Sequence, residues 1–527
     1  MKHVKFLVLI LALAMPASAG CSRPGQAATP PFEALARWVP ADAEQPIFLD
    51  LKPAGEAGRH WERIRQRLES NPSGKLGLDA LEGQFRVGQY GLGEVLAGPV
   101  VSWDDVRASH IIAQVADEGA AAGAMLRHFA TVEWEHEILD DTTLYHGRDL
   151  GSWQGRTYLA WAVQDGFLFL AYQYDRDALA VLREQLGVEP DGSLASLPVW
   201  QRLRDRLPPS PMALAFMNIS FSFLNSDRAN TSGSESLGEA LNRHIVAHAF
   251  AVVPEEQGIR VEIASEVALP ADAPADLRAL FNQPAVDPAA WTGLPSSAAF
   301  TLVGHDGPLL WPLLRDMFDL GALEQLAGPA GLDLGADLFG AGGPLAGDFA
   351  IALTPPLPDQ PISQGVPAGQ LLVLAQGTSE AQVADLQAAM EGRGAVFGPR
   401  EVEGVPLQTQ LGTEASGYAV SFGFDGDAFL FGSSPEAVGQ AVAARRGQGL
   451  VTTDAFQTLQ AALPDEITSF VTINCGQWTR LVQANMIEEQ YQNSEAFVFL
   501  EAFDAIGIGL RFPPDGKIKG VAYFLMQ

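Results

Sequence analysis

The sequence predicts an α+β protein made of two homologous repeats, each a mostly antiparallel sheet with packed helices. Residues of the same character recur 256 positions apart in the two halves (474 − 218 = 256). Predicted strands also follow one another before a helix begins, an order that favours antiparallel over doubly wound parallel sheets. The recurring positions are Asn218 and Asn474, Leu207-Pro208 and Leu463-Pro464, Trp200 and Phe456, and Leu203 and Leu459.

The 527 residues, 47% of them hydrophobic, are sufficient for more than one core. The first repeat is expected at 38–269 and the second at 297–527. Residues 1–20 read as a signal peptide and 21–37 as a flexible tether. Residues 270–296 are predicted to be a linker, because clustered prolines interrupt helices and strands. These prolines are Pro270, Pro274, Pro284, Pro288 and Pro295.

Both repeats are predicted to contain the same elements in the same order. Asp-Gly pairs at 165–166 and 425–426 indicate tight hairpin turns, because glycine adopts positive φ without steric cost. Period-two and helical patterns place the other elements. In the first repeat, strands are expected at 45–51, from 100, at 111–115, 158–163, 167–170, up to 218, and at 246–253 and 260–267, with helices at 57–68, 119–128, 175–186 and 197–206. In the second, strands are expected at 298–303, from 349, at 371–374, 418–422, 429–431, up to 474, and at 506–512 and 518–525, with helices at 309–326, 379–390, 434–444 and 454–462.

The hairpins that close the two repeats carry small residues on one face. Alternation along a strand sends successive side chains to opposite faces, so a face of alanine or glycine lets another layer approach closely. That layer is a packed helix or, alternatively, a groove or a surface where the two copies meet. The small residues are Ala247, Ala249 and Ala251 in the first repeat, and Gly507 and Gly509 in the second.

The N-terminus reads as an export signal. Lys2 and Lys5 precede a nine-residue apolar run, Phe6 to Ala14, which is too short for a bilayer that needs roughly twenty residues. Cleavage after Ala19 fits an ordinary signal peptidase. Cleavage before Cys21 fits the bacterial lipobox, although Ser18 stands where an aliphatic residue is usual.

Lipidation of Cys21 would attach the protein to a membrane through its N-terminus, with the polar segment after it as the tether. The predicted location is extracytoplasmic: an outer-membrane lipoprotein or a periplasmic protein, or a secreted protein if the chain is cut after Ala19. Ser22, in the position next to Cys21, is consistent with sorting to an outer membrane.

Composition restricts the partners. The net charge of −30, from 33 basic and 63 acidic residues, repels phosphate backbones and anionic headgroups, so nucleic-acid binding is not expected. The chain has two cysteines, Cys21 and Cys475, so no disulfide framework is expected. Cys475 ends an apolar segment and is interpreted as a buried, unreactive thiol.

No residue pattern indicates catalysis, a cofactor or a metal. His244 and His248 have helical metal-ligand spacing, but they fall on a predicted strand, which separates them by roughly 13 Å. His136 and His146 flank a predicted turn, but a metal site needs three or four converging ligands.

Asn218 and Asn474 are the paired polar positions of greatest interest. Asparagine tolerates a left-handed backbone and commonly ends strands, which gives both residues a structural interpretation. The functional alternative is a pair of polar contacts, Asn218 and Asn474, in a cleft between the two copies.

Three motifs carry a resemblance to a known family. They are Val39-Pro40-Ala41-Asp42-Ala43 before a strand, the 165–170 segment Asp-Gly-Phe-Leu-Phe-Leu with its following Asp-Ala-Leu helix, and the run from Ser193 to Leu203 before Leu-Pro. From about Trp38 to the end, the chain resembles the bacterial exported family known as domain of unknown function 3352. The resemblance implies an envelope or secreted protein and supplies no activity, cofactor or catalytic residue.

The predicted function is therefore a non-enzymatic, envelope-anchored or secreted binding or scaffold protein, which holds a protein or an apolar ligand between its two copies. One alternative is a lipid- or lipoprotein-handling factor, which requires an apolar cavity of several hundred Å³. Another is an extracytoplasmic hydrolase whose acidic residues converge only in the folded state, with shifted pKa values.

Overall fold

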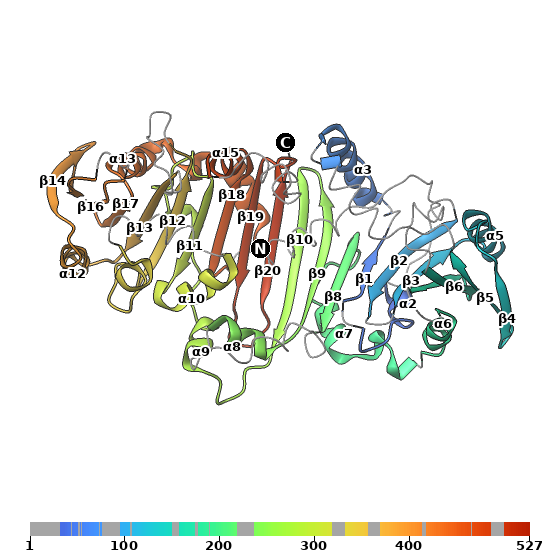
Figure 1. The fold of residues 1–527 in the computed structure, drawn as a ribbon. Coiled ribbons are helices and arrows are strands. Elements are labelled where there is room, and N and C mark those ends of the chain that lie inside the picture. Colours follow the sequence, from blue (N-terminus) through green and yellow to red (C-terminus); the bar gives the residue numbers. More distant parts are fainter. Residues whose placement is uncertain are drawn as a thin grey trace. The chain divides into compact units, whose positions relative to one another are not determined.

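The structure, a computed structural model, divides into two compact units. Figure 1 labels their helices and strands. The N-terminal unit comprises the described residues within Phe6–Thr231 together with Ile245–Val267, and the C-terminal unit those within Ser232–His244 and Ala268–Gln527. The described chain thus passes from the N-terminal unit into a short segment of the C-terminal unit and then returns to the N-terminal unit at Ile245–Val267. All described residues after Val267 belong to the C-terminal unit. The described residues are 32–43, 45–50, 53, 55–72, 74–75, 95–105, 108–149, 157–173, 178–188, 190–218, 237–318, 332–356, 369–413, 418–464, 466–485 and 500–526.

The N-terminal unit is built on an antiparallel sheet with the strand order β4-β5-β6-β7-β3-β2-β1-β8-β9-β10. Its strands are β1 (Ile47–Leu49), β2 (Leu96–Asp104), β3 (Ser109–Val115), β4 (Glu135–Leu139), β5 (Thr142–Asp149), β6 (Thr157–Gln164), β7 (Phe167–Gln173), β8 (Ala213–Asn218), β9 (Ile245–Glu255) and β10 (Gly258–Val267).

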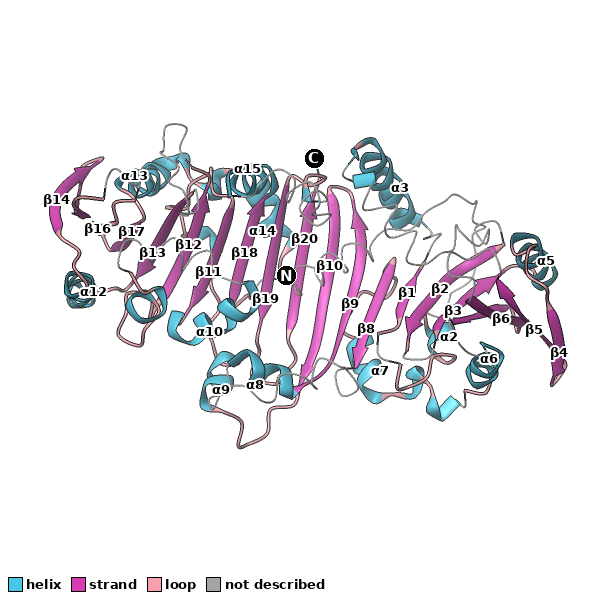
Figure 2. Ribbon diagram, in the orientation of Figure 1, coloured by secondary structure: helices cyan, strands magenta, loops and turns pink. Residues whose placement is uncertain are grey.

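The C-terminal unit repeats this strand order as β14-β15-β16-β17-β13-β12-β11-β18-β19-β20, again fully antiparallel. The predicted antiparallel sheets with packed helices are therefore confirmed (Figure 2). The strands are β11 (Phe300–His305), β12 (Asp348–Thr354), β13 (Gln370–Gln376), β14 (Phe397–Val402), β15 (Val405–Gln410), β16 (Ser421–Asp425), β17 (Ala428–Gly432), β18 (Ser469–Asn474), β19 (Ala505–Arg511) and β20 (Lys519–Leu525).

Helices pack on both sheets. Among the described residues, none of them has the length and apolar character needed to cross a membrane. In the N-terminal unit they are α2 (Glu33–Ala36), α3 (Gly55–Ser70), α5 (Glu118–His128), α6 (Ala178–Leu186) and α7 (Pro198–Arg204). In the C-terminal unit they are α8 (Leu237–His244), α9 (Ala275–Leu280), α10 (Gly307–Phe318), α12 (Glu380–Gly392), α13 (Pro435–Ala443), α14 (Asp454–Ala462) and α15 (Cys475–Asn485).

The closing hairpins show why their small faces are needed. In the N-terminal unit Ala247, Ala249 and Ala251 share a core cluster with Trp200 of α7. In the C-terminal unit a Cβ added to Gly507 would stand 3.1 Å from the side chain of Leu459 on α14. The small faces therefore receive helices, which confirms the first of the two interpretations.

Turn and cap residues set the element boundaries. Asp165 and Gly166 adopt φ of 54° and 78° between β6 and β7, as a two-residue hairpin of this hand requires. Ser434 accepts a hydrogen bond from the backbone of Ala437 and so begins α13.

The folded part begins earlier than predicted. The tether was expected to reach residue 37, but Phe32, Leu35 and Ala36 on and beside α2 are fully buried. Phe32 packs against Phe48 of β1, with ring centroids 5.6 Å apart. These apolar side chains bury surface that a free tether would expose to water.

The predicted linker at 270–296 is wrong as a separate segment. Leu277 and Leu280 of α9 are fully buried, and Leu294 belongs to a core cluster of the C-terminal unit. The prolines bound short elements, while the apolar residues between them are held by tertiary packing. The predicted signal peptide lies outside the described residues.

Candidate functional site

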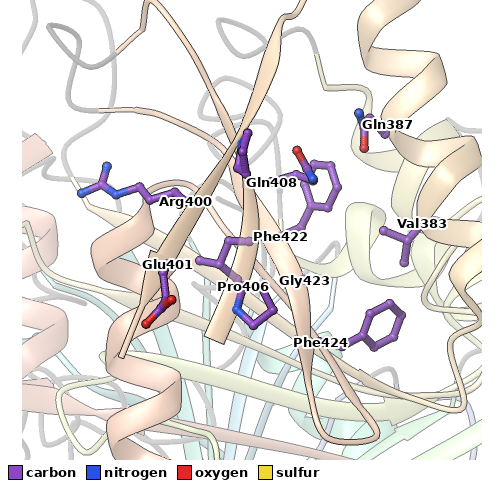
Figure 3. A pocket seen from close by; sticks show the side chains of 11 residues that line it. Val383, Gln387, Arg400, Glu401, Pro406, Gln408, Phe422, Gly423 and Phe424 are labelled. Carbon is purple, nitrogen blue, oxygen red and sulfur yellow. The ribbon is translucent and has the colours of Figure 1, made fainter. Parts of the chain in front are cut away.

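A groove of about 470 Å³ lies in the C-terminal unit between α12 and the strands β14, β15 and β16 (Figure 3). Its volume is within the range of small-molecule sites. Side chains from the helix and from the strands approach each other across it (Figure 3). The lining residues are Val383, Gln387, Pro399, Arg400, Glu401, Pro406, Leu407, Gln408, Phe422, Gly423 and Phe424.

Strand register decides which side chains enter the groove. Pro399 pairs with Gln408, and Gln408 pairs with Phe422, so these residues share one face of the sheet. Leu407 alternates to the opposite face and joins the core cluster that contains Val438 of α13. The tight turn that joins β14 to β15 has positive φ at Glu403 (53°) and Gly404 (80°).

The other wall of the groove is α12. Ser379 begins this helix through a capping box with Gln382, which fixes the position of the first turn. Leu386 and Met390 are buried and anchor the helix, whereas Val383 and Gln387 are half-buried and line the groove. Gln387 Nε2 donates a hydrogen bond to Glu391 Oε1 at 2.7 Å.

Phenylalanine rings form the apolar floor. Phe422 is 1% exposed and lies against Phe397, with ring centroids 5.2 Å apart. Phe424 is half-buried and lies 5.8 Å from Phe429. Both rings contribute apolar surface, and Gln387 and Gln408 contribute amides that can donate and accept hydrogen bonds.

The charged residues stand at the margin of the groove. Arg400 points away from α12 (Figure 3) and lies 3.5 Å from Glu436 of α13, measured between Nη2 and Oε1. The lining residues include no serine, cysteine or histidine. The lining therefore offers a bound molecule apolar contacts and amide hydrogen-bonding groups.

The structure assigns Asn474 a capping role. Its Oδ1 accepts a hydrogen bond from the backbone of Gln477 at 3.0 Å, at the start of α15. Asn218 is 6% exposed at the end of β8. Asn218 and Asn474 both end strands, as their structural interpretation expects. Neither adopts a left-handed backbone, because the described non-glycine residues with positive φ are Asp140, Asp141, Asp165, Asp306 and Glu403. Asn218 and Asn474 as a polar pair in a cleft stay a prediction.

Cys475 is fully buried, and burial, with a smaller contribution from Asp504, raises the pKa of its thiol to about 12. The prediction of an unreactive thiol is thus consistent with its surroundings. Cys21 lies outside the described residues.

The four histidines lie on four different elements, and the predicted strand position is wrong for His244. His244 ends α8 and His248 lies on β9, where its Nδ1 and Ser265 Oγ share a hydrogen bond of 2.6 Å. Across β4 and β5, His146 Nε2 lies 3.8 Å from Glu135 Oε2. Within the described ranges, no group of three or more histidine, cysteine, aspartate or glutamate residues could hold a metal ion.

Sequence reasoning missed the groove. The only local signal is the alternation Phe422-Gly423-Phe424, which places two rings on one face of a strand. Val383, Gln387 and Gln408 join those rings through tertiary structure alone.

Comparisons with known proteins give a family but no activity. A family model described as "Protein of unknown function (DUF3352)" matches residues 184–525. No curated protein matches this chain.

Three crystal forms of a protein described as TP0453 are among the similar solved structures. Form III is 10% identical with a TM-score of 0.25, covering 48% of this chain and 88% of that chain. Form I is 9% identical with a TM-score of 0.25, covering 46% and 81%, and form IV is 9% identical with a TM-score of 0.24, covering 44% and 79%. Similarity at this level supports no conclusion about fold or function.

Proposed function

Because the chain belongs to the DUF3352 family of proteins of unknown function, its role has to come from its own residues, and we propose that it is a non-enzymatic binding protein. Its ligand is a small apolar molecule held in the groove between α12 and β14–β16. The observation that carries the proposal is the lining: phenylalanine rings, Val383 and two amides line an open groove of about 470 Å³.

The groove chemistry favours binding over the alternative of hydrolysis. A hydrolytic site places a nucleophile beside a base, or two carboxylates around a bond. The groove brings an isolated carboxylate, Glu401, to its margin beside Arg400. Apolar rings with a few oriented polar groups are instead the usual composition of a ligand pocket.

Filling the groove is expected to abolish ligand binding. In Val383→Trp the indole occupies the space beside Phe424, so we expect the affinity for the neutral probe N-phenyl-1-naphthylamine to fall at least tenfold. Ala384→Trp is the matched control, because Ala384 is the next residue on α12 and is exposed. Fluorescence titration measures both affinities. If the unsubstituted protein does not bind the probe, or if both variants bind it equally, the groove is not the site.

We further propose that the chain is exported and anchored through a lipid on Cys21. The support is the sequence alone: a basic start, a short apolar run and small residues before Cys21. In a Gram-negative expression host, mass spectrometry of the mature N-terminus is expected to show a diacylated or triacylated Cys21, and Cys21→Ser to release the protein from the membrane fraction. A mature chain that begins at Gly20 contradicts the anchor.

We also propose that the two units arose by duplication of one ancestral unit. The identical strand order of β1 to β10 and β11 to β20 supports this origin. Trp200 of α7 and Phe456 of α14 support it too, because each is 1% exposed at the corresponding place in its unit. A common origin predicts that truncating either ring destabilises its unit by a comparable amount.

A further inference from the structure

The groove has a counterpart in the N-terminal unit, where the same place is filled. Strands β5 and β6 correspond to β15 and β16 in the common strand order. Trp161 lies three residues before Gln164, the last paired residue of β6, and Phe422 lies three residues before Asp425, the last of β16. Directly opposite Trp161 stands Tyr145, and directly opposite Phe422 stands Gln408.

Aromatic rings fill the site in the N-terminal unit. Tyr145 stacks on Trp161 with ring centroids 4.2 Å apart and an interplanar angle of 10°. Trp134 meets Trp161 edge-on at 6.0 Å and 87°, and Phe129 meets Trp134 at 6.1 Å. This stack supplies the contacts that an aromatic cluster prefers.

The C-terminal unit keeps the edge-on ring but lacks the stacked one. Phe397 meets Phe422 at 5.2 Å and 63°, as Trp134 meets Trp161. The position of Tyr145 is taken by Gln408, whose side chain has no ring. The groove therefore opens where one aromatic ring is missing from an otherwise similar arrangement.

The helices that cover the two sites, α5 and α12, also differ in how closely they pack on the strands. Counting from the cap residues Asp117 and Ser379, Ala121 and Met125 of α5 correspond to Val383 and Gln387 of α12. Ala121 and Met125 are 0% exposed, whereas Val383 and Gln387 are only half-buried. The helix is thus packed closely over the filled site and less closely over the open one.

We propose that the groove binds a small neutral aromatic molecule, whose ring takes the place beside Phe422 that corresponds to Tyr145 on Trp161. This inference rests on the proposed binding function and specifies its ligand class. The ring enters when the Gln408 side chain, which lies opposite Phe422, changes rotamer. A planar ring then stacks at this position, as Tyr145 does in the N-terminal unit.

The polar groups of the groove suit a hydroxyl or similar substituent on that ring. Gln387 and Gln408 each offer an amide oxygen and an amide nitrogen, so they accept from and donate to a phenolic hydroxyl. The net charge of −30 disfavours anionic ligands relative to neutral ones. A free phenol therefore matches the site better than a carboxylate.

Competition against N-phenyl-1-naphthylamine tests the ligand class. We expect p-cresol, which has the ring and substituents of a tyrosine side chain, to displace the probe at a concentration at least tenfold lower than 4-methylcyclohexanol. Equal displacement by the two compounds overturns the aromatic preference and leaves the binding function intact. If the probe does not bind the unsubstituted protein at all, the proposed binding function itself is contradicted, and with it the ligand class.

Exchanging the residue types at Gln408 and Tyr145, which stand opposite Phe422 and Trp161, tests where the ligand ring binds. In Gln408→Tyr the protein's own ring fills the groove, and p-cresol binding is expected to weaken at least tenfold while thermal stability is kept. In Tyr145→Gln a second site is expected to open in the N-terminal unit, which doubles the number of probe molecules bound. Undiminished p-cresol binding by a folded Gln408→Tyr variant overturns the assignment, whether or not Tyr145→Gln folds.

Discussion

Replacing Trp200 with alanine is expected to lower the free energy of unfolding of the N-terminal unit by about 3–5 kcal/mol, because truncating a large buried ring removes its apolar contacts and leaves a cavity. Trp200 is 1% exposed and lies between Phe48 and Phe216, with both pairs of ring centroids 5.3 Å apart. Phe456→Ala is expected to cost the C-terminal unit a comparable but somewhat smaller amount. Among the described residues its ring meets one other ring, that of Phe470, at 5.7 Å.

Urea denaturation and amide hydrogen exchange measure these losses. Exchange resolves the two units, because it reports local opening of the strands in each. The matched controls are Gln201→Ala and Gln457→Ala, which alter the exposed residue next to each ring and should shift stability by no more than about 0.5 kcal/mol. If the ring variants and the glutamine variants behave alike, these helices do not anchor their sheets.

Acidification is expected to destabilise the N-terminal unit through His248. Burial lowers the pKa of His248 from 6.5 to about 4. The unfolded chain therefore binds a proton between these two pH values that the folded chain does not bind. The stability that His248 contributes is complete above pH 6.5 and is lost as the pH falls through about 4.

A pKa shift of this size corresponds to about 3 kcal/mol. We expect a smaller loss, about 1–2 kcal/mol, because His248 is half-buried and keeps some contact with water. Urea midpoints between pH 7 and pH 4 measure the loss. His248→Gln should reduce the pH dependence, whereas His136→Gln, at an exposed histidine, should retain it. Equal slopes for the two variants would show that His248 is not responsible.

Elements with a clear local pattern could be predicted from the sequence. The helix expected at 454–462 forms as α14 with the same bounds, and the helix expected at 119–128 forms as α5. Hairpin turns were located because Asp-Gly pairs have few backbone alternatives. In each case the information lies within a few residues of the element itself.

Elements that depend on tertiary contacts could not be predicted in this way. The apolar stripe of α9 was obscured by the prolines around it, and α2 was assigned to a polar tether. The helix α15 was missed because the small residues Cys475 and Gly476 look like the end of a strand, although Asn474 is a good helix N-cap.

The groove could not be predicted from the sequence, because its prediction depends on the strand register. Gln408 and Tyr145 become comparable only after each is paired with the residue opposite, since neither has a distinctive sequence neighbourhood. The distance between α12 and the strands is likewise a property of packing, which no local pattern encodes.

The return of residues 245–267 to the N-terminal unit has a consequence for protein synthesis and for proteolysis. Until Val267 has left the ribosome, this unit lacks two of its strands, so its completion is delayed past the translation of α8. For the same reason, no single peptide-bond cleavage can separate the two units and leave both of them intact. A protease that acts before Ile245 removes a hairpin from one unit, and one that acts after Val267 leaves a helix of the other behind.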